Sequence, residues 1–246
     1  AERTFSSAST IIRMCRRIGF DGYKDFRRAV TYEAALRRHN EEEEQKEITF
    51  SDSMEDIIEK ITEKNIVSLE DTRNLLDPKS LERCVEIICR SRNVLLFGLG
   101  ASLLAARDLY LKFLRLNKAC VINEDWHAQL LTARNATGED VGLVFSYSGE
   151  TEEVLTCMQA LKENRTPIIA ITRFSASPVA ELADHNIYIA ANESIFRSGA
   201  MSSRLSQLNV VDILYTAFAN RDYEASLSQL SRTHIYKSNG RRQPGE

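Results

Sequence analysis

Three absences narrow the class of protein first. The 246 residues contain no run of 18 or more apolar residues, and the N-terminus has no apolar signal segment. The five cysteines are dispersed and form no C-x-x-C pair, which is typical of a reducing cytosol rather than of a disulfide framework. We therefore expect a soluble, cytoplasmic protein with no membrane partner, and we expect neither a metal site nor a bound cofactor.

The common nucleotide-binding loops are also missing. No G-x-x-x-x-G-K-[ST] loop occurs anywhere in the chain. A dinucleotide fingerprint needs a third glycine after Gly98 and Gly100, but Leu103 stands in its place. Glu124 lies roughly where a ribose-binding acid would fall, yet one acidic residue is weak support. A single phosphate is a better candidate ligand than a nucleotide.

Charge is unevenly distributed along the chain. The formal net charge is −3, but residues 1–39 carry nine basic residues against four acidic ones, so this segment is +5 and the rest is −8. A basic segment attached to an acidic body indicates a local polyanionic partner.

The first part of the chain has helical patterns. Within residues 1–40, Ser9 or Thr10 can cap a short basic helix that ends near Gly19. Residues 41–92 form a linker that begins with an acidic run and continues as connecting helices from Ser53, broken at Asp77-Pro78. The chain starts inside this pattern and without an initiator Met, so we expect a further segment upstream.

From about residue 93 to residue 220, apolar runs alternate with helical patterns, and a C-terminal helix and tail follow over residues 221–246. Candidate strands lie at residues 94–97, 119–122, 141–145, 168–171 and 186–189, and candidate helices at 102–114, 152–164 and 203–219. Runs that are buried on both faces and separated by helices predict an α/β fold with a doubly wound parallel sheet.

Two loops at the predicted carboxyl ends of strands have unusual compositions. Ligands of open parallel sheets bind at these ends. One loop is residues 98–102, and the other is Ser146-Tyr147-Ser148-Gly149-Glu150-Thr151, which leads directly into a helix. Hydroxyls, a glycine and a helix N-terminus suit a phosphate. The alternative is that Ser148 or Thr151 simply caps the helix.

These same loops carry a resemblance to a known family. Residues 97–102 together with the S-x-S-G-E-T turn resemble the paired signature of sugar isomerase (SIS) domains. Residues 193–204 resemble the segment before the last helix of RpiR-type transcriptional regulators, and residues 6–26 resemble the recognition-helix end of their helix-turn-helix domain. The resemblance implies a C-terminal SIS domain preceded by a partial all-α helix-turn-helix domain, whose first helices are missing from this chain.

The resemblance also implies particular sites. The candidate ligand-binding residues are Ser102, His127, Ser146, Ser148, Thr151, Glu193 and Arg197. Among them, His127 could instead be a hydrogen-bonded structural residue, and Glu193 with Arg197 a local ion pair. The candidate DNA-binding residues share one short basic helix and are Ser7, Ser9, Thr10, Arg13, Arg16 and Arg17. An ordinary basic surface helix is the alternative.

The function implied is a sugar-phosphate-responsive transcriptional regulator. It would couple an effector, with N-acetylated amino-sugar 6-phosphates as first candidates, to affinity for a double-stranded DNA operator, and would act as a homodimer or a dimer of dimers. The alternative is an aldose–ketose isomerase that uses the same pocket. Such chemistry needs a general base, for which Glu150, His127 and Glu193 are the nearby candidates. No dedicated base is evident, so we predict no catalytic residues and a protein that is not an enzyme.

Overall fold

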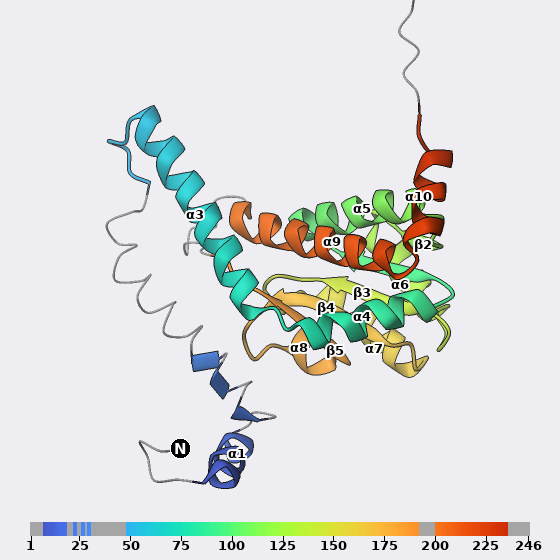
Figure 1. Cartoon of the computed structure of the whole chain (residues 1–246), viewed down its shortest axis with the longest axis horizontal. Coiled ribbons are helices and arrows are strands. Elements are labelled where there is room, and N and C mark those ends of the chain that lie inside the picture. Colours follow the sequence, from blue (N-terminus) through green and yellow to red (C-terminus); the bar gives the residue numbers. More distant parts are fainter. Residues whose placement is uncertain are drawn as a thin grey trace, which may run out of the picture.

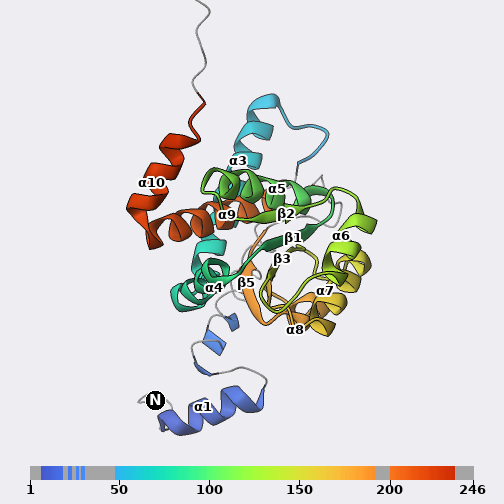
Figure 2. The ribbon, with the colours of Figure 1, turned by 90° about the vertical axis from the view of Figure 1, so that its right-hand side faces the viewer.

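The computed structural model describes residues 7–18, 22–23, 26–27, 29–30, 48–191 and 200–235. Its strands are β1 (Val94–Gly98), β2 (Cys120–Ile122), β3 (Val141–Phe145), β4 (Ile168–Arg173) and β5 (His185–Ile189). They form one parallel sheet in the order β2-β1-β3-β4-β5. Figure 2 labels β2, β1, β3 and β5 of this sheet. The predicted doubly wound parallel α/β fold is confirmed.

Apart from α1, which lies away from the sheet (Figure 1), the described helices pack on its two faces or extend from it. They are α1 (Ala8–Arg17), α3 (Met54–Leu75), α4 (Pro78–Arg90), α5 (Gly100–Arg115), α6 (Trp126–Arg134), α7 (Glu152–Glu163), α8 (Pro178–Leu182), α9 (Met201–Arg221) and α10 (Tyr223–Arg232). Among them, none is both long and apolar enough to span a membrane.

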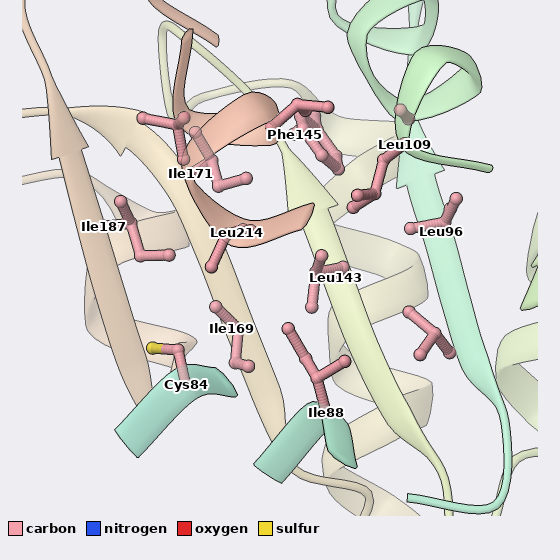
Figure 3. Packing of buried hydrophobic residues seen from close by; sticks show 14 of the residues in the cluster. Cys84, Ile88, Leu96, Leu109, Leu143, Phe145, Ile169, Ile171, Ile187 and Leu214 are labelled. Carbon is pink, nitrogen blue, oxygen red and sulfur yellow. The ribbon is translucent and has the colours of Figure 1, made fainter. Parts of the chain in front are cut away.

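Side chains alternate between the two faces of the sheet. Leu96 of β1 belongs to the apolar cluster beneath α4, α5 and α9, whereas its neighbour Phe97 belongs to the cluster beneath α6, α7 and α8. Figure 3 shows the first cluster, in which Ile88, Leu143 and Leu214 meet. Because successive side chains of a strand point to opposite faces, one continuous apolar run supplies both cores.

The sequence missed or misplaced several elements. The short helices α6 and α8 were not predicted, because nine and five residues give little periodicity. α5 begins at Gly100 rather than Ser102, and α9 begins at Met201 rather than Ser203. The break at Asp77-Pro78 is confirmed, since Pro78 opens α4.

The basic helix α1 begins earlier than predicted. Its N-cap is Ser7, whose Oγ accepts a hydrogen bond from the backbone N–H of Thr10 at 3.2 Å. The prediction of Ser9 or Thr10 as the cap was therefore wrong, because the residue that precedes the first helical turn has the extended backbone that a cap needs. Gly19 lies outside the described residues. The predicted domain boundaries at residues 40, 92 and 220 stay predictions.

The cysteines are free thiols, and most of them are buried. Burial raises the pKa of the thiols of Cys84 and Cys120 to about 12. These two side chains therefore behave as small core residues and not as nucleophiles.

Candidate functional site

A pocket of about 430 Å³ lies beyond the carboxyl ends of β1 and β3. The chain leaves β1 towards β2 on one side, and leaves β3 towards β4 on the other. In parallel sheets of this strand order, the divergence of the two connections creates the crevice in which ligands bind. The pocket is lined by Leu99, Gly100, Ala101, Ser102, Phe145, Ser146, Tyr147, Ser148, Thr151, Val154, Ala200 and Ser203.

Three helices, α5, α7 and α9, begin at this pocket, and none of them has a side-chain cap. Their N-cap residues are Leu99, Thr151 and Ala200, and all three residues line the pocket. Among the other described helices, α4 also lacks a side-chain cap but begins with Pro78, which has no N–H to satisfy. The rest are capped by side chains, as α6 is by Asp125 and α10 is by Asp222. Uncapped N-termini present backbone N–H groups and partial positive charge, which together favour an anion.

Ser146 is a second indication of a ligand. Its side chain is only 3% exposed, and its Oγ has no hydrogen-bond partner. A buried hydroxyl without a partner costs free energy, so native structures rarely retain one without a reason. Because Ser146 lines the pocket, a phosphate oxygen there would supply the missing partner.

The alternative reading of Ser148 and Thr151 as helix caps is not supported by the hydrogen bonds. Thr151 occupies the N-cap position of α7, but its side chain makes no cap hydrogen bond. The Oγ of Ser148 accepts from the N–H of Glu150 at 3.3 Å, which is a bond within the turn. Both side chains therefore line the pocket without capping the helix.

The turn between them depends on a glycine. Gly149 has a φ of +72°, and a Cβ there would lie 2.3 Å from Ser177 Oγ. L-residues with side chains rarely adopt such a conformation, and here there is no space for one. This explains why the turn has glycine between Ser148 and Glu150.

Ser102, on the opposite wall, is held by a residue that the sequence interpretation missed. Gln207 of α9 donates from Nε2 to Ser102 Oγ at 3.0 Å. Gln207 is 1% exposed. A glutamine inside an apolar helical pattern was the available signal, but nothing in the sequence indicated its partner 105 residues away.

Of the remaining predicted ligand residues, the structure describes only His127. His127 is an exposed residue in the first turn of α6, and it does not line the pocket. Glu193 and Arg197 lie outside the described residues. Glu150 also does not line the pocket, and its carboxylate pairs with Arg173 at 3.2 Å. The described lining therefore offers no carboxylate or imidazole as a base.

The predicted DNA-binding residues all lie on α1 or at its N-cap. Ser7, Ser9, Thr10, Arg13, Arg16 and Arg17 are exposed, while Cys15 is buried. Ser7 Oγ lies 2.8 Å from Ser9 Oγ and 2.9 Å from Thr10 Oγ1, so these hydroxyls are linked to one another. Arg13 and Arg17 are four residues apart and share one helix face. Figure 1 shows α1 away from the sheet.

The fold and the pocket define a class, the parallel α/β domains with a binding crevice at the reversal of strand order. Residues 87–217 match the SIS domain family. An uncharacterized HTH-type transcriptional regulator of Caldanaerobacter subterraneus is 33% identical over 228 residues, which are 93% of this chain and 80% of that protein. YbbH of Bacillus subtilis, also described as an HTH-type transcriptional regulator, is 33% identical over 229 residues, with the same coverages.

Solved structures agree with these matches. The Vibrio vulnificus NanR protein complexed with ManNAc-6P has a TM-score of 0.68 and 27% identity, covering 95% of this chain and 81% of that one. A phosphoheptose isomerase from Francisella tularensis has a TM-score of 0.59 at 17% identity, covering 69% of this chain and 100% of that one, and shows the fold alone. The chain belongs to the HTH-type transcriptional regulators that carry a C-terminal SIS domain, and the resemblance found in the sequence is confirmed.

Proposed function

We propose that this protein is a DNA-binding regulator whose SIS domain senses a sugar phosphate and does not convert it. The observation that carries the proposal is the pocket at which three uncapped helices and the unpartnered hydroxyl of Ser146 meet. Backbone N–H groups and hydroxyls donate to phosphate oxygens, and no charged side chain is needed. The volume of about 430 Å³ falls in the range of small-molecule sites.

The effector that we propose first is an N-acetylated amino-sugar 6-phosphate. The 27% identical NanR is described in complex with ManNAc-6P, and it aligns over most of this chain. Ser102, Ser146, Ser148 and Thr151 would hold the phosphate. We further propose that His127 contacts the sugar, and that Glu193 and Arg197 contact the sugar or a subunit interface.

On the DNA side, α1 would face the double-stranded operator in a homodimer or a dimer of dimers in the cytoplasm. Exposed hydroxyls at the start of a helix suit phosphates and base edges, and the arginines of the following turns suit the phosphate backbone or guanine. This accounts for the +5 charge of residues 1–39 against −8 for the rest.

Calorimetry tests the ligand. We expect the full-length protein to bind N-acetylmannosamine 6-phosphate and to bind the unphosphorylated sugar far more weakly. Thr151→Val should weaken binding roughly tenfold, because about 1.4 kcal/mol of hydrogen bonding to a charged group is lost. Thr156→Val is the matched control on the same helix, since Thr156 lies outside the pocket lining and bonds the carbonyl of Glu152.

Two outcomes would contradict the proposal. The first is the absence of binding to any hexose or amino-sugar 6-phosphate in a panel. The second is conversion of a bound aldose phosphate to its ketose, followed by NMR over long incubation, which would instead establish the isomerase.

A further inference from the structure

The first two turns of α9 have four buried polar side chains. Ser202, Ser203, Ser206 and Gln207 are each at most 2% exposed. Polar groups in a protein interior are destabilising unless they are hydrogen-bonded. The partners of these four side chains therefore show which parts of the protein the N-terminal end of α9 connects. The four residues form two stripes, each of two residues one helical turn apart.

One stripe faces the ligand pocket. Ser203 lines the pocket, and Gln207 donates to Ser102 Oγ at 3.0 Å. Because Gln207 supplies the proton of that bond, the hydroxyl proton of Ser102 remains able to point into the pocket. Ala200, the N-cap of α9, also lines the pocket and has a φ of +54°. The position of this helix end therefore affects how well a ligand is held.

The other stripe faces α3. Ser202 Oγ lies 3.1 Å from Asn65 Oδ1 of α3. Ser206 Oγ donates to the carbonyl of Ala190 at 2.7 Å, just beyond β5, and lies 3.5 Å from the carbonyl of Ser68. One rigid helix thus contacts the pocket on one side and α3 on the other.

Ala190 is the point at which α3 and the sheet meet. Thr72 of α3 is fully buried, and its Oγ1 accepts from the N–H of Ala190 at 3.0 Å and donates to its carbonyl at 3.1 Å. Since β5 is an edge strand, Thr72 supplies the hydrogen bonds that a neighbouring strand would otherwise make. The carbonyl of Ala190 therefore bonds both Thr72 and Ser206.

The S-x-S-G-E-T turn contacts the backbone beside Ala190 independently of α9. Tyr147, which lines the pocket, donates from its hydroxyl to the carbonyl of Ala191 at 2.9 Å. Ala191, the residue next to Ala190, is thus hydrogen-bonded to the S-x-S-G-E-T turn. Two separate connections, through Gln207 and through Tyr147, link the pocket to the backbone that Thr72 holds.

We propose that the junction of Thr72, Ala190, Ser202 and Ser206 transmits occupancy of the pocket to α3, and thereby to the DNA-binding segment. This inference rests on the proposed function. A ligand that binds more tightly to one placement of the α9 N-terminus shifts the protein towards that placement. The hydrogen bonds at the junction then shift α3 with it.

α3 is suited to amplify such a shift. It has 22 residues, and at 1.5 Å per residue it is about 33 Å long. Its C-terminal half is held at the junction, while its N-terminal end projects beyond the sheet domain (Figure 1). Thr72 at the junction is 18 residues, or about 27 Å, from Met54, so a tilt of roughly 10° there would move the far end by about 5 Å.

The decisive experiment separates ligand binding from its effect on DNA. In full-length Thr72→Val, we expect the Kd for N-acetylmannosamine 6-phosphate to stay within about threefold of the wild type. Saturating ligand changes the operator affinity of the wild type by some factor, in either direction. In Thr72→Val this ratio of affinities with and without ligand should shrink at least about tenfold towards unity, because the coupling free energy is lost. Thr72→Ser keeps the hydroxyl and should restore the ratio.

Thr166→Val is the matched control. Thr166 is a buried threonine that donates to the carbonyl of Thr137 at 3.0 Å, away from the junction. It should lose comparable stability and keep the wild-type ratio. Should Thr72→Val fail to fold, Ser206→Ala removes only one bond to Ala190 and reports the same ratio.

A wild-type ratio in Thr72→Val or Ser206→Ala would overturn the inference, as would an equal loss in Thr166→Val. A wild-type protein that binds the sugar phosphate without any change in DNA affinity would refute the proposed function, and the inference with it. Failure of the inference is therefore seen in the variants, whereas failure of the proposed function is seen in the wild-type protein.

Discussion

Gln129 completes the hydrogen bonding of Gly98 at the end of β1. Its Nε2 donates to the Gly98 carbonyl at 3.0 Å, and its Oε1 accepts from the Gly98 N–H at 3.2 Å. β2 pairs with β1 only as far as Ile122 opposite Leu96. The side-chain amide therefore takes the place of a missing strand residue, and it fixes the backbone that leads into the pocket.

Replacement of this amide should destabilise the fold. In Gln129→Leu, two buried backbone groups lose their partners, and we expect the free energy of unfolding to fall by roughly 2–4 kcal/mol. Urea denaturation measures this loss. The exposed Gln159 of α7 offers the control Gln159→Leu, which should change stability by less than about 0.5 kcal/mol. Equal effects of the two substitutions would refute the role given to Gln129.

Ser146→Ala should separate stability from binding. The substitution removes a buried hydroxyl that has no partner, so the ligand-free protein should be as stable as the wild type or more so by about 1 kcal/mol. The affinity for the sugar phosphate should nevertheless fall about tenfold or more. Thermal unfolding with and without ligand measures both quantities. A large loss of stability without ligand would show that Ser146 is structural.

Gly149→Ala should distort the S-x-S-G-E-T turn. The positive φ and the contact of 2.3 Å with Ser177 Oγ leave no strain-free place for a methyl group. We expect a loss of roughly 1–3 kcal/mol in stability, together with loss of measurable sugar-phosphate binding by calorimetry. Gly138→Ala is the control, because its Cβ would meet Arg165 O at an ordinary 3.5 Å. If Gly149→Ala binds like the wild type, the loop geometry is not what holds the ligand.

Asp140 should make stability depend on pH. Its burial opposes ionisation, but hydrogen bonds from Asn93 at 2.7 Å, from Thr137 and from Arg92 outweigh this and lower the pKa of the carboxyl below 3.8. A lowered native pKa contributes stability that is present above the unfolded-state value and is lost as the pH falls through the native value.

The matching substitution is Asp140→Asn. At pH 7 it should cost roughly 1.5–3 kcal/mol, because hydrogen bonds to a charged group are lost. The difference from the wild type should shrink as the pH falls below the ordinary carboxyl value of 3.8. Urea midpoints measured from pH 7 down to the acid limit of folding test this, and a difference that is independent of pH would contradict it.

The arginines of α1 should set the salt dependence of DNA binding. If Arg13 and Arg17 each neutralise one phosphate, the double substitution to alanine should reduce the slope of log K against log salt by about 1.8. Fluorescence anisotropy at several salt concentrations measures the slope. Arg90→Ala on α4, where Arg90 pairs with Glu86, is the control and should leave the slope unchanged. An unchanged slope in the double variant would remove α1 from the DNA interface.

The sequence by itself determined the parallel α/β fold and the place of the pocket. Apolar runs such as residues 94–97 and 141–145 must be buried on both faces, which only a covered parallel sheet allows. The S-x-S-G-E-T turn, with a glycine that the backbone requires, marked the strand end at which the pocket lies. These features are local in the chain, so periodicity and turn chemistry suffice to read them.

Only the tertiary structure decided which polar groups meet. The helices α6 and α8 are too short to have a readable period, and tertiary contacts stabilise them. Gln207 and Ser102 are 105 residues apart, and Thr72 reaches Ala190 across 118 residues. Each hydrogen bond depends on where two separate elements come to rest, and no local pattern records it. For the same reason the sequence located one turn of the pocket but not the helix end that completes it.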